Sequence, residues 1–201
     1  MDRRHAAIRR RRRRLILLFG AGLLVAVGVW SLPLARRAVN DLILPLDYSS
    51  LIRQQAADKH LDPALVAAVI YAETRFIPRT SPTGAEGLMQ IEPATAEYLA
   101  HRSGGVAFQV SDLGTPAVNI AYGAYYLRVL LDQFHGNRIM ALAAYNGGET
   151  NVLRWLAAAR AHGESFRIDD IPFPETRAYV ERVLQTRADY RHTYAAQLGY
   201  R

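Results

Sequence analysis

The sequence contains no cysteine among its 201 residues. Disulfide bonds, thiolate nucleophiles and cysteine-ligated metal sites are therefore excluded. The six histidines show no HExxH spacing, the pattern in which two imidazoles one helical turn apart hold a zinc ion. The absence of cysteine does not assign the protein to a compartment, because exported proteins can lack it as well.

An excess of positive charge is also missing from most of the chain. The formal net charge is +7, but residues 1–14 hold eight of the 25 basic side chains and one of the 18 acidic ones. The rest of the chain holds 17 of each sign, a net charge of zero. A nucleic-acid-binding domain is expected to carry a basic face. We therefore expect no nucleic acid partner, and the arginine run indicates membrane topology instead.

The segment Leu15–Leu34 has no charged residue. As a helix it would be about 30 Å long, which matches the hydrocarbon core of a bilayer. By the positive-inside rule we predict a cytoplasmic tail at 1–14, a single-pass transmembrane anchor at 15–35, a tether at 36–46 and an exported remainder. A cleaved signal peptide is the alternative, disfavoured by the length of the run and the lack of a clean cleavage site. A buried core helix is disfavoured by the adjacent arginines.

From Asp47 onward the pattern is that of helices joined by short loops. Asp62-Pro63 and Thr115-Pro116 each place an N-cap residue before a proline at the first helical position. No alternation of period two predicts a strand, and Ser81–Gly87, rich in proline and glycine, is expected to be a loop. The expected helices are 48–60, Pro63 to before Pro78, 93–101, 116–134, 138–144, 149–161 and 175–194. The domain at 47–201 is therefore expected to be mostly α-helical.

Glu73 stands out on the second of these helices. It continues an apolar stripe of helical spacing formed by Leu65, Val66, Val69 and Ile70. Burial raises the pKa of a carboxyl group, and the negative end of the helix dipole acts in the same direction. A general acid that works near neutral pH needs such a shift. Spacing alone equally allows a salt bridge to Arg75 or Arg79, or a position at the rim.

Four motifs follow one another along the chain. They are AETRF around Glu73, SPTGAEGLMQIEPATA at Ser81–Ala96, ALAAYNGG at Ala141–Gly148 and PETRAYVERV at Pro174–Val183. In this order they resemble the soluble lytic transglycosylase (SLT) family, related to goose-type lysozyme, over roughly Asp47–Tyr190. The resemblance implies a mostly α-helical fold of the lysozyme-like α+β superfamily, with two helical lobes around a cleft.

The resemblance also implies roles for single residues. Glu73 matches the catalytic glutamate, followed by threonine where serine is usual, and the segment from Glu73 to Ser81 is one residue short. The residues expected to bind substrate are Ser81, Met89, Gln90, Tyr145, Asn146, Glu175 and Tyr179, and Tyr179 is implied to orient the glutamate. Structural alternatives remain open: Met89 can fill the core, Gln90 can satisfy backbone groups, Asn146 can end a helix and Glu175 can complement a helix dipole.

These implications define the expected activity. It is lytic cleavage of the β-1,4 bond between N-acetylmuramic acid and N-acetylglucosamine in peptidoglycan, with a 1,6-anhydro product and Glu73 as the single acid and base. Most glycosidases use two carboxylates, but here the substrate's N-acetyl group can assist and its C6 hydroxyl can attack within the same sugar. No metal or cofactor is required, and the expected partners are glycan strands and the cytoplasmic membrane. A hydrolytic muramidase on the same fold and a non-catalytic wall-binding module are the alternatives.

Overall fold

The computed structural model describes residues 43–104, 108–161, 163 and 165–200. Nearly all of these residues belong to the second of the two units into which the chain divides, Pro45–Arg201. The predicted tail at 1–14, the anchor at 15–35 and most of the tether at 36–46 lie outside the described residues. Among the residues that are described, no helix is both long and apolar enough to cross a bilayer.

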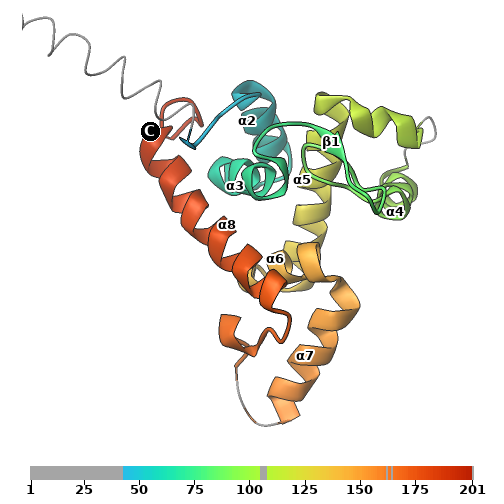
Figure 1. Cartoon of the computed structure of the whole chain (residues 1–201), viewed down its shortest axis with the longest axis vertical. Coiled ribbons are helices and arrows are strands. Elements are labelled where there is room, and N and C mark those ends of the chain that lie inside the picture. The colour runs from blue at the N-terminus through green and yellow to red at the C-terminus, as the bar shows by residue number, and fades with distance from the viewer. Residues whose placement is uncertain (1–42, 105–107, 162, 164, 201) are drawn as a thin grey trace, which may run out of the picture. The chain divides into compact units, whose positions relative to one another are not determined.

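The second unit is mostly α-helical, as predicted (Figure 1). In chain order its elements are α2 (Ser49–Asp58), α3 (Pro63–Thr74), β1 (Arg79–Thr80), β2 (Glu86–Gly87), α4 (Pro93–Ser103), η1 (Val110–Gly114), α5 (Pro116–Gln133), α6 (Arg138–Gly147), α7 (Glu149–Ala161), η2 (Ile168–Asp170) and α8 (Pro174–Thr193). The predicted helices are confirmed to within a few residues at each end.

Local capping explains where several helices begin. The Asp62 carboxylate accepts a hydrogen bond from the Ala64 amide at 3.0 Å, and the Asn137 side chain accepts one from the Met140 amide at 3.1 Å. Both bonds satisfy amides that the first turn of a helix leaves unpaired. The Thr115 side chain makes no such bond at the start of α5, so Pro116 alone marks that start.

Helix α3 forms the buried centre of this unit. Every residue from Ala64 to Ile70 is buried, so these two turns have no polar face. The helix packs most extensively against α8 and also against α2, while α6 packs against α5, α7 and α8. Figure 1 shows α8 as a long diagonal helix with α6 near its start and α3 beside it further along. The C-terminal end of α3 therefore reaches the region where α6 and α8 meet.

The chain leaves α3 through a small hairpin that the sequence pattern did not predict. Arg75 and Phe76 both have left-handed backbone angles, with φ of 51° and 65°, and turn the chain out of the helix. Strands β1 and β2 then pair antiparallel, with Arg79 opposite Gly87. The expectation that Ser81–Gly87 is entirely loop is thus corrected at its end. Strands of two residues are too short to show an alternating pattern.

Candidate functional site

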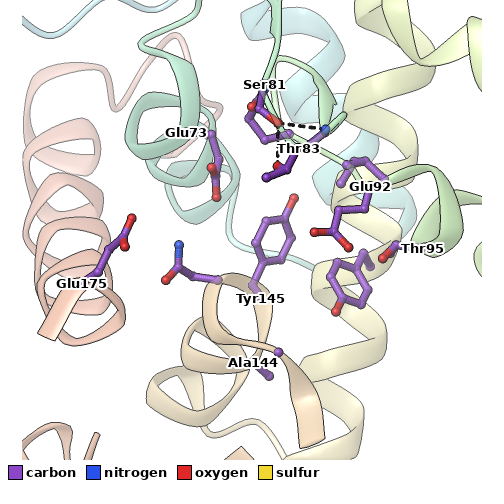
Figure 2. Close-up of a pocket in the computed structure, with 14 residues that line it drawn as sticks. Glu73, Ser81, Thr83, Glu92, Thr95, Ala144, Tyr145 and Glu175 are labelled. Atoms are coloured by element: carbon purple, nitrogen blue, oxygen red, sulfur yellow. Dashed lines mark hydrogen bonds between the residues drawn. The ribbon is translucent and has the colours of Figure 1, made fainter. Parts of the chain in front are cut away.

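A cavity of about 370 Å³ lies at the C-terminal end of α3. Figure 2 shows Glu73, Tyr145 and Glu92 facing a shared space, with Ser81 and Thr83 on one side of it and Glu175 on another. The residues that line it are Glu73, Ser81, Thr83, Ala85, Gln90, Ile91, Glu92, Thr95, Tyr126, Ala144, Tyr145, Asn146, Gly148 and Glu175. Six of the eight residues predicted for the site lie in this wall; Met89 and Tyr179 do not.

Glu73 combines burial with access to this cavity. Burial raises the pKa of Glu73 from 4.5 to about 7, although the nearby Tyr179 hydroxyl and the positive charges of Arg182 and Arg79 act to lower it. The carboxylate makes no salt bridge with either described neighbour, Arg75 or Arg79. Arg79 instead donates from Nη2 to the Glu73 backbone carbonyl at 2.7 Å. The predicted upward shift is confirmed, and a carboxyl group with this pKa can give and take a proton near neutrality.

Tyr179 on α8 approaches the same carboxyl group from the protein interior. Its side chain is only 2% exposed, and burial raises the pKa of Tyr179 well above its ordinary range, with the charge of Glu73 adding to the rise. The Tyr179 hydroxyl is close enough to the Glu73 carboxyl group to lower the pKa of Glu73, but it is not aligned for a regular hydrogen bond with any residue that the structure describes. Arg182 lies 6.0 Å from the centre of the Tyr179 ring. Tyr179 therefore lies beside the Glu73 carboxyl group, as the implied orienting role requires, and is not among the residues that line the cavity.

Ser81 opens the turn between β1 and β2. Its Oγ accepts a hydrogen bond from the Ala85 amide at 2.9 Å and shares another with the Thr83 hydroxyl at 2.9 Å. The Ser81 amide donates to the Ala85 carbonyl at 2.8 Å, which closes the turn. The short segment after Glu73 therefore still brings this serine into the wall that contains Glu73 (Figure 2).

The segment Gly87–Gln90 is held in place by side chains. Thr74, the residue after Glu73, donates from its hydroxyl to the Leu88 carbonyl at 2.8 Å. Gln90 donates from Nε2 to the carbonyls of Gly87 and Arg79, at 2.9 Å and 2.8 Å. Gln90 thus closes the hairpin through its amide nitrogen and also lines the cavity, where its amide oxygen can accept a hydrogen bond.

Asn119 on α5 completes this support and was not identified from the sequence. It is fully buried, and its Oδ1 accepts a hydrogen bond from the Met89 amide at 2.8 Å. Its Nδ2 donates to the carbonyls of Glu86 and Leu113, at 2.9 Å and 3.0 Å. A buried amide with all its groups paired gives a rigid link. The sequence offered no signal, because Met89 lies 30 positions earlier in the chain.

Met89 belongs to the core and is not among the residues that line the cavity. Its side chain is fully buried, and a Cβ on Gly123 would lie 2.4 Å from its sulfur. The absence of a side chain at Gly123 therefore makes room for Met89 against α5. The Met89 carbonyl accepts a hydrogen bond from the Tyr145 hydroxyl at 2.9 Å, which fixes the tyrosine ring in the cavity wall.

Asn146 on α6 and Glu175 on α8 also line the cavity. Both are exposed, one near the end of α6 and the other in the first turn of α8. Between them Gly147 packs closely on Thr176, since a Cβ on this glycine would lie 2.9 Å from the Thr176 hydroxyl. This close approach brings Asn146 and Glu175 into one wall.

Four polar residues of the wall were missed by sequence reasoning: Thr83, Glu92, Thr95 and Tyr126. Burial raises the pKa of Tyr126 to about 12, with the charges of Glu149 and Glu92 adding to the rise. The described lining residues include three glutamates and no lysine, arginine or histidine. The wall therefore has an acidic character.

No group of three or more potential metal ligands occurs within the part of the chain that the structure describes.

Comparison with known proteins identifies relatives of this chain. The family model described as "Transglycosylase SLT domain" matches residues 50–167, which ends before Glu175 and Tyr179. The soluble lytic murein transglycosylase of Salmonella typhimurium is 38% identical over 157 residues, covering 74% of this chain and 23% of that protein. The transglycosylase of Enterobacteria phage PRD1 is 40% identical over 118 residues, covering 58% of this chain and 40% of that protein.

Solved structures give the same assignment. An inactive glutamate-to-glutamine mutant of the lytic transglycosylase Slt from Pseudomonas aeruginosa has a TM-score of 0.70 and 33% identity, over 78% of this chain and 26% of that one. The 70 kDa soluble lytic transglycosylase of Escherichia coli has a TM-score of 0.69 and 32% identity, over 80% and 28%. The chain spans about a quarter of the length of the soluble lytic transglycosylases it matches. It belongs to the SLT transglycosylase domain family, as the order of its motifs predicted.

Proposed function

We propose that this protein is a peptidoglycan lytic transglycosylase in which Glu73 is the single acid and base. The observation that carries the proposal is the position of Glu73, in the wall of a polar cavity and with its pKa raised by burial to about 7. The names of the relatives support activity on murein, and the inactive mutant among the solved structures supports a glutamate as the key residue in that relative.

In the first step, protonated Glu73 donates its proton to the glycosidic oxygen between N-acetylmuramic acid and N-acetylglucosamine. The bond between C1 of the muramic residue and that oxygen breaks, and the N-acetylglucosamine part leaves with the proton on its oxygen. The N-acetyl oxygen of the muramic residue bonds to C1 as an internal nucleophile. The Glu73 carboxylate that remains is stabilised by Tyr179 and by the charges of Arg182 and Arg79, the same groups that act to lower its pKa in the free protein.

In the second step, the Glu73 carboxylate takes the proton of the C6 hydroxyl while that oxygen attacks C1. The bond between C1 and the N-acetyl oxygen breaks as the new C–O bond closes the 1,6-anhydro ring. No water enters the product, and Glu73 is protonated again. Attack within one molecule gains from a high effective concentration, which reduces the need for a second carboxylate.

The other cavity residues are proposed to bind the sugars. Ser81, Gln90 and Asn146 offer hydroxyl and amide groups, and Glu175 offers a carboxylate. Tyr145 adds an aromatic face that the hydrogen bond to Met89 holds in place. Two buried residues support the residues that line the cavity. Met89 contacts Tyr145 through its backbone carbonyl, and Tyr179 lies beside Glu73.

A hydrolytic muramidase is the second candidate, and one observation favours it. Glu92 and Glu175 line the same cavity as Glu73, so a second carboxylate is available to activate a water molecule. In that reaction water would replace the C6 hydroxyl, and the product would be a reducing sugar.

We also propose that residues 15–35 anchor the enzyme in the cytoplasmic membrane, with the N-terminus inside and the catalytic domain on the periplasmic side. The uncharged run after the arginine block supports the anchor, and so does 30% identity over 166 residues with the membrane-bound lytic murein transglycosylase C of Yersinia enterocolitica. Tethering would raise the local concentration of the enzyme at the wall. Carbonate extraction tests this, because release of the intact chain from membranes would contradict an anchor.

Mass spectrometry of the sugars released from purified sacculi tests the activity. The full chain, in detergent, is compared with Glu73→Gln and with Glu97→Gln, an exposed glutamate of α4 outside the cavity wall. Wild type and Glu97→Gln should release 1,6-anhydro sugars, and Glu73→Gln should be slower by at least about 100-fold, since general acid catalysis contributes that much. Reducing ends without anhydro sugar would establish the muramidase instead. Cleavage by Glu73→Gln at the wild-type rate would refute the role of Glu73.

A further inference from the structure

Glu92 faces the cavity from the side opposite Glu175, next to Thr95 and Tyr145 (Figure 2). It occupies the N-cap position of α4, but its side chain makes no capping hydrogen bond. Its carboxylate accepts no hydrogen bond from any residue that the structure describes. The charge nevertheless acts on the cavity, because it contributes to the raised pKa of Tyr126 in the same wall.

A free carboxylate in a binding wall needs a partner when ligand displaces water from it. Desolvating an ion without a partner opposes binding. The described residues of the wall offer no lysine, arginine or histidine to pair with Glu92, while Glu175 adds to the negative potential and Glu73 is neutral when it holds the proton that it donates. Glu92 is exposed to solvent, so a ligand that covers it can supply this partner. A positively charged group of the ligand fits the negative wall better than an anionic group does.

A purely structural explanation for Glu92 is its place at the start of a helix. An acidic residue there is favoured by the helix dipole whether or not a ligand binds. That explanation predicts a change in stability and none in substrate preference. Glu97, five positions along the same helix, is exposed and does not line the cavity, so it serves as a matched control for removing one acidic charge from α4.

We infer that Glu92 is a specificity-determining residue that binds a primary ammonium group carried by the peptidoglycan strand. This inference rests on the proposed activity at the same site. Two parts of such a strand can carry this group: the side chain of a diamino acid in an uncrosslinked peptide stem, and the C2 amine of a glucosamine that lacks its acetyl group. Either would place a cation against the carboxylates of the wall.

Chemical acetylation of amines tests the inference. Apparent KM and kcat of the full chain, Glu92→Gln and Glu97→Gln are measured on untreated sacculi and on sacculi whose free amines have been acetylated with acetic anhydride. On untreated sacculi Glu92→Gln should raise KM about three- to fivefold, as expected for a solvent-exposed ion pair, with kcat unchanged. Wild type should show the same rise on acetylated sacculi, where Glu92→Gln should match it. Glu97→Gln should follow wild type on both substrates.

Two defined substrates distinguish the sources of the amine. One is fully N-acetylated glycan with uncrosslinked peptide stems, and the other is peptide-free glycan with some glucosamine deacetylated. The difference between wild type and Glu92→Gln should persist on the substrate that carries the relevant amine. Equal KM for both proteins on every substrate, or the same loss in Glu97→Gln, would overturn the inference.

Binding to sacculi separates this inference from the proposed activity. Glu73→Gln and the double variant Glu73→Gln/Glu92→Gln are sedimented with untreated and acetylated sacculi. If the double variant binds untreated sacculi more weakly than Glu73→Gln does, and both variants bind acetylated sacculi equally, the role of Glu92 is supported. This holds even if the product analysis overturns lytic cleavage. Equal binding of the two variants to both preparations overturns it.

Discussion

The acidity of Glu73 results from opposing influences of its surroundings. Burial favours the neutral acid and outweighs the three groups that favour the anion, Tyr179, Arg182 and Arg79. Tyr145 also interacts electrostatically with this carboxylate, since the charge of Glu73 adds to the rise in the pKa of Tyr145 that burial causes. A carboxyl group with a much higher pKa would be a poor proton donor in the first step. One with a much lower pKa would not hold its proton before the first step and would be a weak base in the second. By lowering the pKa of Glu73, Arg182 and Arg79 therefore balance its ability to donate a proton in the first step against its ability to accept one in the second.

Arg182→Gln should move the pH dependence of the activity upward. Wild-type kcat/KM should fall as the pH rises through about 7, because Glu73 then loses the proton that it donates. Removing the positive charge of Arg182 removes a cause that lowers this pKa, so the alkaline limb should shift to higher pH. We expect a few tenths of a unit to about one unit, since Arg182 is exposed and solvent screens its charge.

The measurement is a pH–rate profile at low ionic strength. Arg154→Gln provides the control, because Arg154 is an exposed arginine on α7 that does not act on Glu73. An alkaline limb that stays in place in Arg182→Gln, or that moves to lower pH, would contradict this account of the carboxyl group.

At the scale of elements, the hairpin and the segment after it pack closely against Asn119 of α5. Gly87 has a φ of 74°, and a Cβ there would lie 2.2 Å from the Asn119 Nδ2. Gly87→Ala should therefore displace Asn119 and break its bonds to the backbone. We expect a loss of about 2–4 kcal/mol in the free energy of unfolding, with reduced activity because Gln90 and Ser81 lose their support.

Gly84→Ala is the matched control for this prediction. Gly84 also has a positive φ, 88°, but a Cβ there would meet no atom within 4 Å. It should cost only about 1 kcal/mol, the strain of a left-handed alanine. Urea unfolding of both variants gives the comparison. Equal losses would show that backbone strain alone matters at Gly87 and that the contact with Asn119 does not.

The helices and the hairpin show how far the structure could be predicted from the sequence. Helices α3, α5 and α6 could be predicted because the residues at their starts, Asp62, Pro116 and Asn137, act on neighbouring residues in the sequence. The hairpin could not, since its strands of two residues are too short for an alternating pattern. Asn119 could not, since it bonds to Met89 and Glu86, which lie 30 and 33 positions away in the chain. Motifs placed Glu73, Ser81 and Glu175 in the site. They did not reveal that Met89 and Tyr179 point inward, or that Glu92 points into the cavity, because a motif does not give the direction of a side chain.

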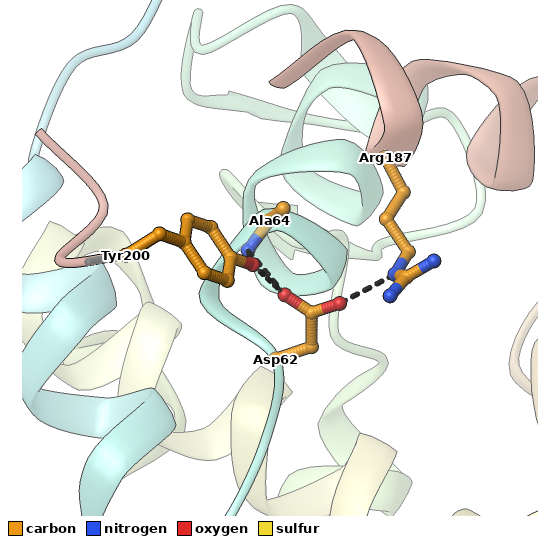
Figure 3. Close-up of polar contacts among 4 residues, drawn as sticks. All are labelled: Asp62, Ala64, Arg187 and Tyr200. Atoms are coloured by element: carbon orange, nitrogen blue, oxygen red, sulfur yellow. Dashed lines mark hydrogen bonds and ion pairs between the residues drawn. The ribbon is translucent and has the colours of Figure 1, made fainter. Parts of the chain in front are cut away.

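At the scale of the domain, the C-terminal segment returns to the start of α3 (Figure 3). The Tyr200 hydroxyl donates a hydrogen bond to the Asp62 carboxylate and accepts one from the Ala64 amide at 3.2 Å. Arg187 on α8 pairs with the other oxygen of Asp62 at 2.5 Å, and Arg191 lies 4.8 Å from the centre of the Tyr200 ring. These contacts fasten one end of α3 to α8 and to the end of the chain, while Glu73 occupies its other end.

Asp62→Asn should destabilise the domain at neutral pH and weaken its response to acid. Burial acts to raise the pKa of Asp62, but hydrogen bonds from Tyr200, Arg187 and Ala64 and the charge of Arg187 together hold it below 3.8. A pKa that is lower in the folded protein stabilises the fold above the unfolded pKa, and this contribution is lost as the pH falls through the folded value. Allowing for partial solvent exposure, we expect a loss of about 1–3 kcal/mol at pH 7. Urea unfolding at pH 7 and near pH 3 measures this loss of stability. Asp169→Asn is the control, because Asp169 is exposed. Equal loss of stability in acid for Asp62→Asn and wild type would contradict the prediction.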